Sequence, residues 1–245
     1  MSTSPTGKPP IGREARIAAS VAIWQRFRER QQHHFGTQRL PFVTISRQYG
    51  CEALPLADRL VEILNERFHP PVPWASYDRE VLDLVADDLH ISRHELAAVD
   101  GCRRDALSEF FDSILNRKLD EAVMFRKIAG VIRSLACRGH TVLVGRGSYL
   151  ITQGLQTGLH VRLIAPRQWR IENIATKKNL SFKEAERDVL QGEAQRDAFI
   201  RTFFLGEPPN PFHLILENSL LTVPQMAEII VTALQARFGP HHATG

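Results

Sequence analysis

The apolar residues of this chain fall into short continuous runs, separated by longer stretches of helical periodicity. Runs that are brief and apolar on both faces are typical of strands in a parallel sheet that helices cover on both sides. Four such runs lie at residues 42–46, 141–144, 159–164 and 212–216, and a weaker candidate lies at 72–75. We therefore expect five strands.

Helical patterns fill the gaps between the expected strands. Capping boxes at Ser181 with Glu184 and at Thr222 with Gln225 predict the starts of two helices. Further helices are expected over 54–68, 121–138 and 166–178, and residues 78–116 predict a helical excursion. The repeated strand–helix order predicts an α/β fold, a doubly wound parallel five-stranded sheet with helices on both faces.

The first 40 residues differ from the rest of the chain. Residues 1–10 are rich in Pro and Ser and predict a mobile tail, whereas 13–32 have the spacing of an amphipathic helix. This segment carries seven basic and two acidic side chains, a surplus of five, while the whole chain has a net charge of +4. We expect the helix to pack on the domain or to form a homodimer. Nucleic-acid binding through its arginines is less favoured.

Composition excludes several classes of protein. No apolar run approaches the ~20 residues of a membrane span, and the N-terminus lacks the pattern of a secretory signal, so we expect a cytoplasmic protein. The three cysteines, Cys51, Cys102 and Cys137, form no closely spaced pair. We therefore expect neither a disulfide framework nor a metal site.

The turns after the strands are the places to look for a ligand site, because ligands bind beyond the carboxyl ends of parallel strands. After the first strand, the loop enters a helix at the spacing of a phosphate loop. Such a loop needs glycines, a lysine and a hydroxyl. Here Gly50 is present, but Glu52, Ala53 and Leu54 or Pro55 occupy the positions of the second glycine, the lysine and the hydroxyl.

Two further segments carry candidate arginines. Gly145-Arg146-Gly147 follows the third strand, where the glycines allow close approach of a ligand and the arginine suits phosphate. The charged residues of 167–201 are interpreted mostly as surface ion pairs. Arg196 and Arg201 are exceptions, because apolar residues border them.

Five ordered segments together resemble the cytidylate kinase-like family, relatives of the nucleoside monophosphate kinases. They read VTISRQYGC, SYDREVLDLVA, TVLVGRGSYLI, HVRLIAPRQWRIENIATKKNLSFKEAERDV and FHLILENSLL, and the likeness runs from about Phe42 to Phe238. It implies a P-loop kinase-like domain over 41–240 with a helical lid at about 177–205.

The resemblance also implies roles for individual residues. The cofactor would lie against Ser46, Arg47, Gln48, Tyr49, Gly50, Cys51 and Asn218. The substrate would lie against Asp78, Arg79, Gly145, Arg146 and Gly147. Arg47, Arg196 and Arg201 would be catalytic, with ATP and Mg²⁺ as cofactors if the protein is active.

Two functions remain open. The resemblance favours ATP-dependent phosphoryl transfer to a nucleoside monophosphate, with a pyrimidine base. Because Glu52 and Ala53 remove a glycine and a cation from the loop, the alternative is a non-catalytic relative that binds a nucleotide or another phosphate ligand and acts as a sensor or partner protein.

Overall fold

The computed structural model describes residues 40–88, 119–204 and 211–239, together with the helical residues Ala15, Ala18, Ser20 and Ala22. Met1–Gly36 and Thr37–Gly245 are two compact units. Most of the predicted N-terminal helix, most of the excursion over 78–116, and Cys102 lie outside the described residues. None of the helices in the described ranges is long and apolar enough to cross a membrane.

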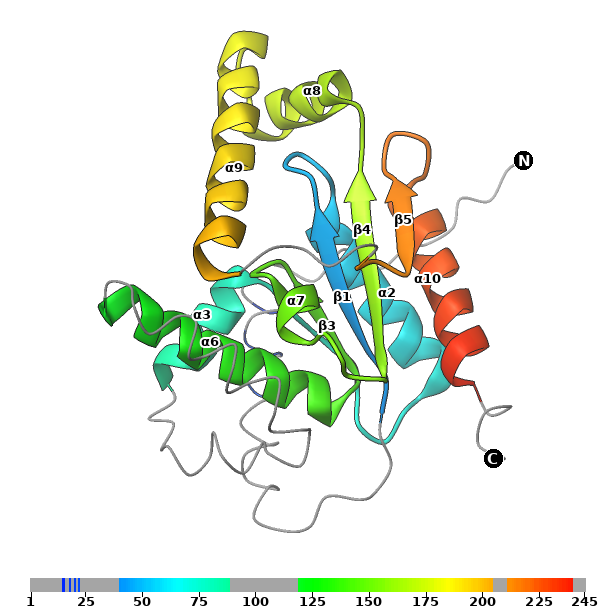
Figure 1. The fold of residues 1–245 in the computed structure, drawn as a ribbon. Helices are drawn as coiled ribbons and strands as arrows, with labels where there is room; N and C mark the ends of the chain where they lie inside the picture. The colour runs from blue at the N-terminus through cyan, green and yellow to red at the C-terminus, as the bar shows by residue number, and fades with distance from the viewer. Residues whose placement is uncertain are drawn as a thin grey trace, which may run out of the picture. The chain divides into compact units, whose positions relative to one another are not determined.

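A five-stranded sheet forms the centre of the second unit, as far as the structure describes it (Figure 1). All its pairings are parallel, and the strand order is β2-β3-β1-β4-β5. The strands are β1 (Phe42–Arg47), β2 (Ala75–Tyr77), β3 (Thr141–Val144), β4 (Gly158–Ile164) and β5 (Leu214–Glu217). The predicted fold class is confirmed, and β1 lies in the middle with β3 and β4 beside it.

β2 begins three residues later than the sequence predicts. The backbone N–H of Trp74 donates to Asn65 Oδ1 at 2.8 Å, and the Trp74 carbonyl accepts from Asn65 Nδ2 at 3.0 Å. The backbone N–H and carbonyl of Trp74 are therefore both bound by the side chain of Asn65, a helix residue. The ladder begins at Ala75, whose N–H donates to the His140 carbonyl.

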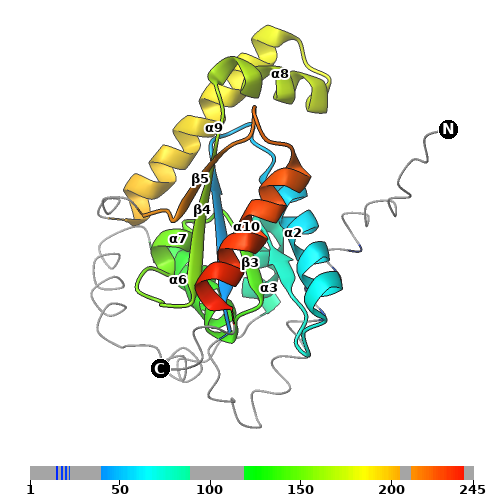
Figure 2. The same cartoon turned by 90° about the vertical axis from the view of Figure 1, so that its right-hand side faces the viewer.

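Helices cover both faces of the sheet (Figures 1 and 2). α2 (Ala53–Phe68) and α10 (Val223–Phe238) pack together over one face, and on the other lie α3 (Arg79–Asp88), α6 (Leu119–Arg138) and the short α7 (Ser148–Ile151). Leu56, Leu60 and Ile230 are fully buried in the core between α2, α10 and the sheet. Each such side chain contributes about 1.5–3 kcal/mol through burial.

α8 (Arg167–Lys178) and α9 (Phe182–Phe203) form a hairpin beyond the carboxyl ends of the strands (Figure 1). α8 begins after Pro166, which is its N-cap, and α9 begins with the expected capping box at Ser181. At its far end, α9 packs its aromatic residues on Phe125 of α6. The ring centroids of Phe125 and Phe203 lie 4.2 Å apart. The hairpin thus contacts the domain at the end of α9 as well as at the loop after β1.

Candidate functional site

The loop after β1 lies against α8. Gly50 has a φ of 96°, and a Cβ added there would lie 2.7 Å from Arg170 Cβ and 2.9 Å from the Arg170 carbonyl oxygen. A side chain at this position would clash with the helix and strain the backbone. Glycine is therefore required where the loop passes beneath α8.

Three backbone N–H groups at the start of α2, those of Cys51, Glu52 and Ala53, are bound within the protein. The bonds run from Cys51 N–H to the Gln48 carbonyl (3.3 Å), from Glu52 N–H to Asn218 Oδ1 (2.7 Å) and from Ala53 N–H to the Cys51 carbonyl (3.1 Å). Pro55, the third residue of the helix, has no N–H. A phosphate loop uses such N–H groups to hold phosphate oxygens, so these three donors are already bound within the chain.

Ala53 at the lysine position and Glu52 at the second-glycine position both make contacts within the protein. Ala53 is 1% exposed and its side chain packs in the core between α2 and the sheet. The Glu52 carboxylate accepts from Lys177 Nζ at 2.7 Å. In this conformation the loop does not fit a magnesium-bound triphosphate.

Arg170 of α8 binds the loop after β1, and its side chain is buried, at 5% exposed. Its Nη1 donates to the Tyr49 carbonyl at 3.0 Å and to Glu193 Oε1 at 2.5 Å, and its Nε donates to the Ala165 carbonyl at 2.9 Å. This burial contradicts the interpretation of the arginine as part of a surface ion pair. Asn173, one turn further along α8, donates its Nδ2 to the Gly50 carbonyl at 2.6 Å.

Tyr49 is the loop side chain that enters the hairpin. A Cβ added to Gly192 would lie 2.3 Å from the Tyr49 ring, and the Arg196 guanidinium lies over the same ring, 5.0 Å from its centroid. The Tyr49 hydroxyl donates to Asp188 Oδ2 at 3.1 Å and accepts from Lys178 Nζ at 3.0 Å. The ring and hydroxyl predicted to contact a cofactor are thus engaged by α8 and α9.

Arg47 ends β1 and lies against the loop after β3. A Cβ added to Gly145 would lie 2.6 Å from Arg47 Nη1, and Arg196 Nη1 donates to the Arg47 carbonyl at 3.0 Å. Burial, and then the neighbouring Arg196, lower the pKa of Arg47 to about 10, although Asp78 partly opposes them. Among the described residues no acceptor binds this guanidinium. A desolvated cation without an acceptor is suited to an anionic ligand.

Arg146 is held differently. Its backbone is left-handed, with a φ of 53° between the positive φ values of Gly145 and Gly147. Its Nη2 donates to both carboxylate oxygens of Asp83, at 2.7 and 2.5 Å. The charge of Arg146 is therefore matched by α3, whereas that of Arg47 is not matched by a direct ion pair.

The other predicted residues divide into two groups. Asp78 lies near Arg47, and Asn218 reaches the loop, where it is 4% exposed and its Nδ2 has no partner within the described residues. Two others lie apart from the loop. Arg201 is exposed in the last turn of α9, and Arg79 Nε lies 3.8 Å from Asp83 Oδ2. The structure thus gathers Arg47, Gly145, Arg196, Asp78 and Asn218 at the carboxyl edge of the sheet.

The sequence interpretation missed three residues of α8 that bind the loop. Arg170, Asn173 and Lys177 are spaced three and four residues apart, so they lie on one face of the helix. That spacing was visible in the sequence. Because the charged residues of 167–201 were interpreted as surface ion pairs, this shared helix face was not identified as a contact with the loop.

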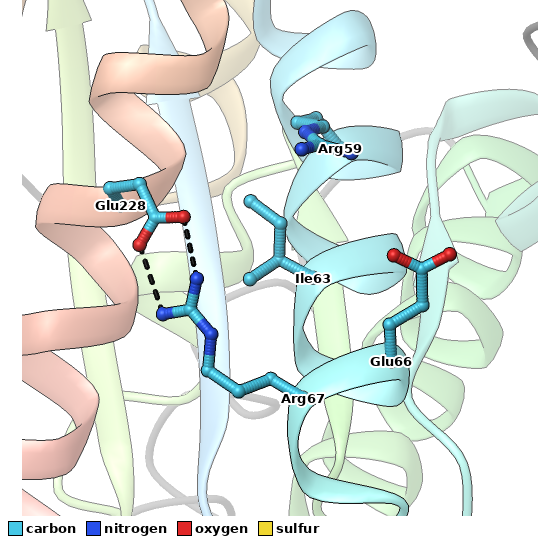
Figure 3. A pocket seen from close by; sticks show the side chains of 5 residues that line it. All are labelled: Arg59, Ile63, Glu66, Arg67 and Glu228. Carbon is cyan, nitrogen blue, oxygen red and sulfur yellow. Dashed lines mark hydrogen bonds and ion pairs between the residues drawn. The ribbon is translucent and has the colours of Figure 1, made fainter. Parts of the chain in front are cut away.

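A surface hollow of about 290 Å³ lies between α2 and α10, away from these residues (Figure 3). It is lined by Arg59, Ile63, Glu66, Arg67 and Glu228. Two hydrogen bonds, of 3.0 and 2.7 Å, join Arg67 and Glu228 across it. Arg67 and Glu228 are exposed and paired with each other, and Arg59 is paired with Glu62, so both cations that line the hollow already have carboxylate partners.

One solved structure supports the fold, and two others match with lower scores. An uncharacterized protein from Eubacterium ventriosum ATCC 27560 matches 82% of this chain and 100% of its own, at 14% identity and a TM-score of 0.61. Shikimate kinase from Bacteroides thetaiotaomicron matches 80% of this chain and 96% of its own (14% identity, TM-score 0.40). Dephospho-CoA kinase from Campylobacter jejuni matches 80% of this chain and 98% of its own (12% identity, TM-score 0.36).

Among curated proteins, no sequence matches this chain. A sequence model of the cytidylate kinase-like family matches residues 42–220. These are 179 of the 245 residues, and they span the sheet from β1 to β5, the α8–α9 hairpin and the turn that carries Asn218. The chain therefore belongs to the cytidylate kinase-like family.

Proposed function

We propose that this protein binds a nucleotide or a similar phosphorylated ligand at the carboxyl edge of β1 and β3, without transferring phosphate. Arg47 supplies the charge, because its guanidinium is partly buried beside Gly145 and has no acceptor among the described residues. Arg196 adds a second positive charge from α9. The site is one for binding an anion.

The observation that carries the non-catalytic part of the proposal is the occupied loop. Phosphoryl transfer depends on positioning the phosphates and neutralising the charge that develops on them. In this loop the N–H groups of Glu52 and Ala53 already have acceptors within the chain. Glu52 stands where a phosphate loop carries its second glycine, and Lys177 is paired with its carboxylate, so this pair supplies no net positive charge for a phosphate at this end of α2.

A second candidate function is ATP-dependent phosphoryl transfer to a pyrimidine nucleoside monophosphate. One contact favours it: Lys177 Nζ, 2.7 Å from Glu52 Oε1, brings an ammonium group from α8 to the loop that lacks its own lysine. In that function ATP and Mg²⁺ are the cofactors. The loop would have to release its internal hydrogen bonds to accept them.

Binding and turnover measured on the same preparation separate the two functions. Calorimetric titration with CMP, dCMP and UMP measures affinity, and chromatography of mixtures with ATP and Mg²⁺ detects nucleoside diphosphates. We expect binding without product. Arg47→Ala should abolish the binding, and the matched control Arg201→Ala, at an exposed arginine, should retain it.

Product that disappears in Arg47→Ala would establish the kinase instead. A wild-type chain that gives neither heat of binding nor product with any of the nucleotides would refute both functions.

A further inference from the structure

We propose that His213 is a pH-sensitive latch: its neutral imidazole holds the start of the edge strand β5 on β4, and protonation of the ring releases it. His213 directly precedes β5, at the opposite end of the strand from Asn218. Three features of this end of the sheet carry the proposal. They are the hydrogen bond that the ring accepts, the charged groups around the ring, and the sparse packing of β5.

The ladder between β4 and β5 begins with a side chain. The N–H of His213 donates to the His160 carbonyl at 2.8 Å, and the N–H of His160 donates to Nδ1 of the His213 ring at 2.9 Å. The regular pairing starts one residue later, with Val161 opposite Leu214. The imidazole therefore takes the place of the next backbone acceptor in the parallel ladder.

Only a neutral His213 can accept this hydrogen bond. An imidazole nitrogen accepts only when it carries no proton, and both ring nitrogens of an imidazolium are donors. The structure thus requires the tautomer with its proton on Nε2. A second proton on Nδ1 would face the N–H of His160 and leave that amide without its acceptor. His213 is exposed, so protons from the solvent reach the ring.

Two titratable or charged groups of the described residues face the His213 ring from neighbouring elements. His160 of β4 stacks on it with 5.1 Å between ring centroids, and Arg237 of α10 lies near both rings. Burial, and then the charge of Arg237, lower the pKa of His213 from its ordinary value of 6.5. Release of the strand removes both effects. The released form therefore binds a proton that the paired form does not, so acid favours release below about pH 6.5.

The start of β5 is weakly packed. In the described sheet β5 is an edge strand that pairs with β4 alone. Of its four residues only Leu216 is buried, and Ile215 is 60% exposed. A segment with so few buried contacts can open without unfolding of the domain. Asn218 holds the other end, because its N–H donates to the Ile164 carbonyl at 2.8 Å. We therefore expect the opening to be confined to the start of the strand.

The test is amide hydrogen exchange of the full chain, measured by NMR at pH 7.5 and pH 5.5 and corrected for the intrinsic exchange rates. Protection of the His160 and His213 amides should fall by up to about tenfold at pH 5.5, the effect of one group that titrates near 6.5 when released. The amides of β1 and of Asn218 should keep their protection. Unchanged protection at His160, or an equal loss at the β1 amides, would overturn the proposal.

Variants at residue 213 test whether its ring is the cause. His213→Asn places an oxygen as many bonds from the backbone as Nδ1, and this acceptor does not titrate. It should retain the protection at pH 7.5 and abolish the effect of acid, whereas His213→Ala should lower protection at both pH values. His69→Asn, at an exposed position, is the control and should keep the wild-type response. An effect of acid that persists in His213→Asn, or wild-type protection in His213→Ala at pH 7.5, would refute the latch.

Discussion

The carboxylate of Glu52 lies 2.7 Å from the ammonium group of Lys177, so the phosphate-loop position and α8 carry opposite charges in contact. The two side chains are 26% and 43% exposed, and an ion pair in such a setting contributes little to stability. The ion pair instead affects the charge at the loop. Glu52 brings a negative charge to the loop, and Lys177 neutralises it.

Lys177→Ala should weaken ligand binding without unfolding the protein. We expect the free energy of unfolding to change by less than about 1 kcal/mol, because the pair is partly exposed. The affinity for a monophosphate should fall severalfold, since Glu52 is then an unbalanced anion beside the site. Urea unfolding and calorimetry measure the two effects. Lys183→Ala, at an exposed position of α9, should change neither, and equal affinities for wild type and Lys177→Ala would contradict the prediction.

Arg170→Met should destabilise the domain strongly. The substitution leaves Glu193 without its cation and removes the donor to two backbone carbonyls, and breaking such an ion pair costs about 3 kcal/mol. Urea unfolding gives the value. Glu193→Leu in the same chain should recover part of the loss. Arg167→Ala, at an exposed position of the same helix, is the control; a loss no larger than that of the control would show that Arg170 does not hold the loop.

Gly192→Ala tests whether Tyr49 anchors the hairpin. The added methyl group would lie 2.3 Å from the tyrosine ring, so the ring or α9 has to move. Overpacking of this kind costs about 1–3 kcal/mol, measured by chemical unfolding. Gln191→Ala, in the adjacent exposed position, should cost much less. Tyr49→Ala combined with Gly192→Ala should cost less than the sum of the two single changes; additive costs would mean that the two residues do not contact each other.

The fold was predictable because its signals are local. Brief apolar runs mark the strands, and the capping boxes at Ser181 and Thr222 begin α9 and α10 as expected. The boundary of β2 was not predictable, because it depends on the contact of Trp74 with Asn65 on a helix that precedes it.

The site was predictable only in part. Arg47 ends β1 and Gly145 follows β3, and the rule that ligands bind at the carboxyl ends of a parallel sheet predicts that the two residues lie near a site. The bond between Glu52 and Asn218 joins residues 166 positions apart, and no local pattern marks it. The spacing of Arg170, Asn173 and Lys177 shows that they share one face of α8, but spacing alone does not distinguish a buried arginine from an exposed one.

His160 on β4 is a buried group outside the ligand site that should make stability depend on pH. Its Nδ1 lies 2.9 Å from Thr44 Oγ1, and its ring stacks on His213 with 5.1 Å between centroids. Burial, and then the nearby His213 and Arg237, lower the pKa of His160 from 6.5 to about 4. The folded protein therefore keeps this imidazole neutral at pH values where the unfolded chain protonates it.

The sign of the effect follows from proton binding. Between about pH 6.5 and pH 4 the unfolded state binds a proton at residue 160 that the folded state does not, so acid favours unfolding. The contribution of His160 is fully present above pH 6.5, and about 3 kcal/mol is lost as the pH falls to 4. His160→Gln should flatten the free energy of unfolding over this range, measured by urea unfolding at several pH values. The exposed His69→Asn should keep the wild-type slope, and a slope that His160→Gln also keeps would assign the acid sensitivity to other groups.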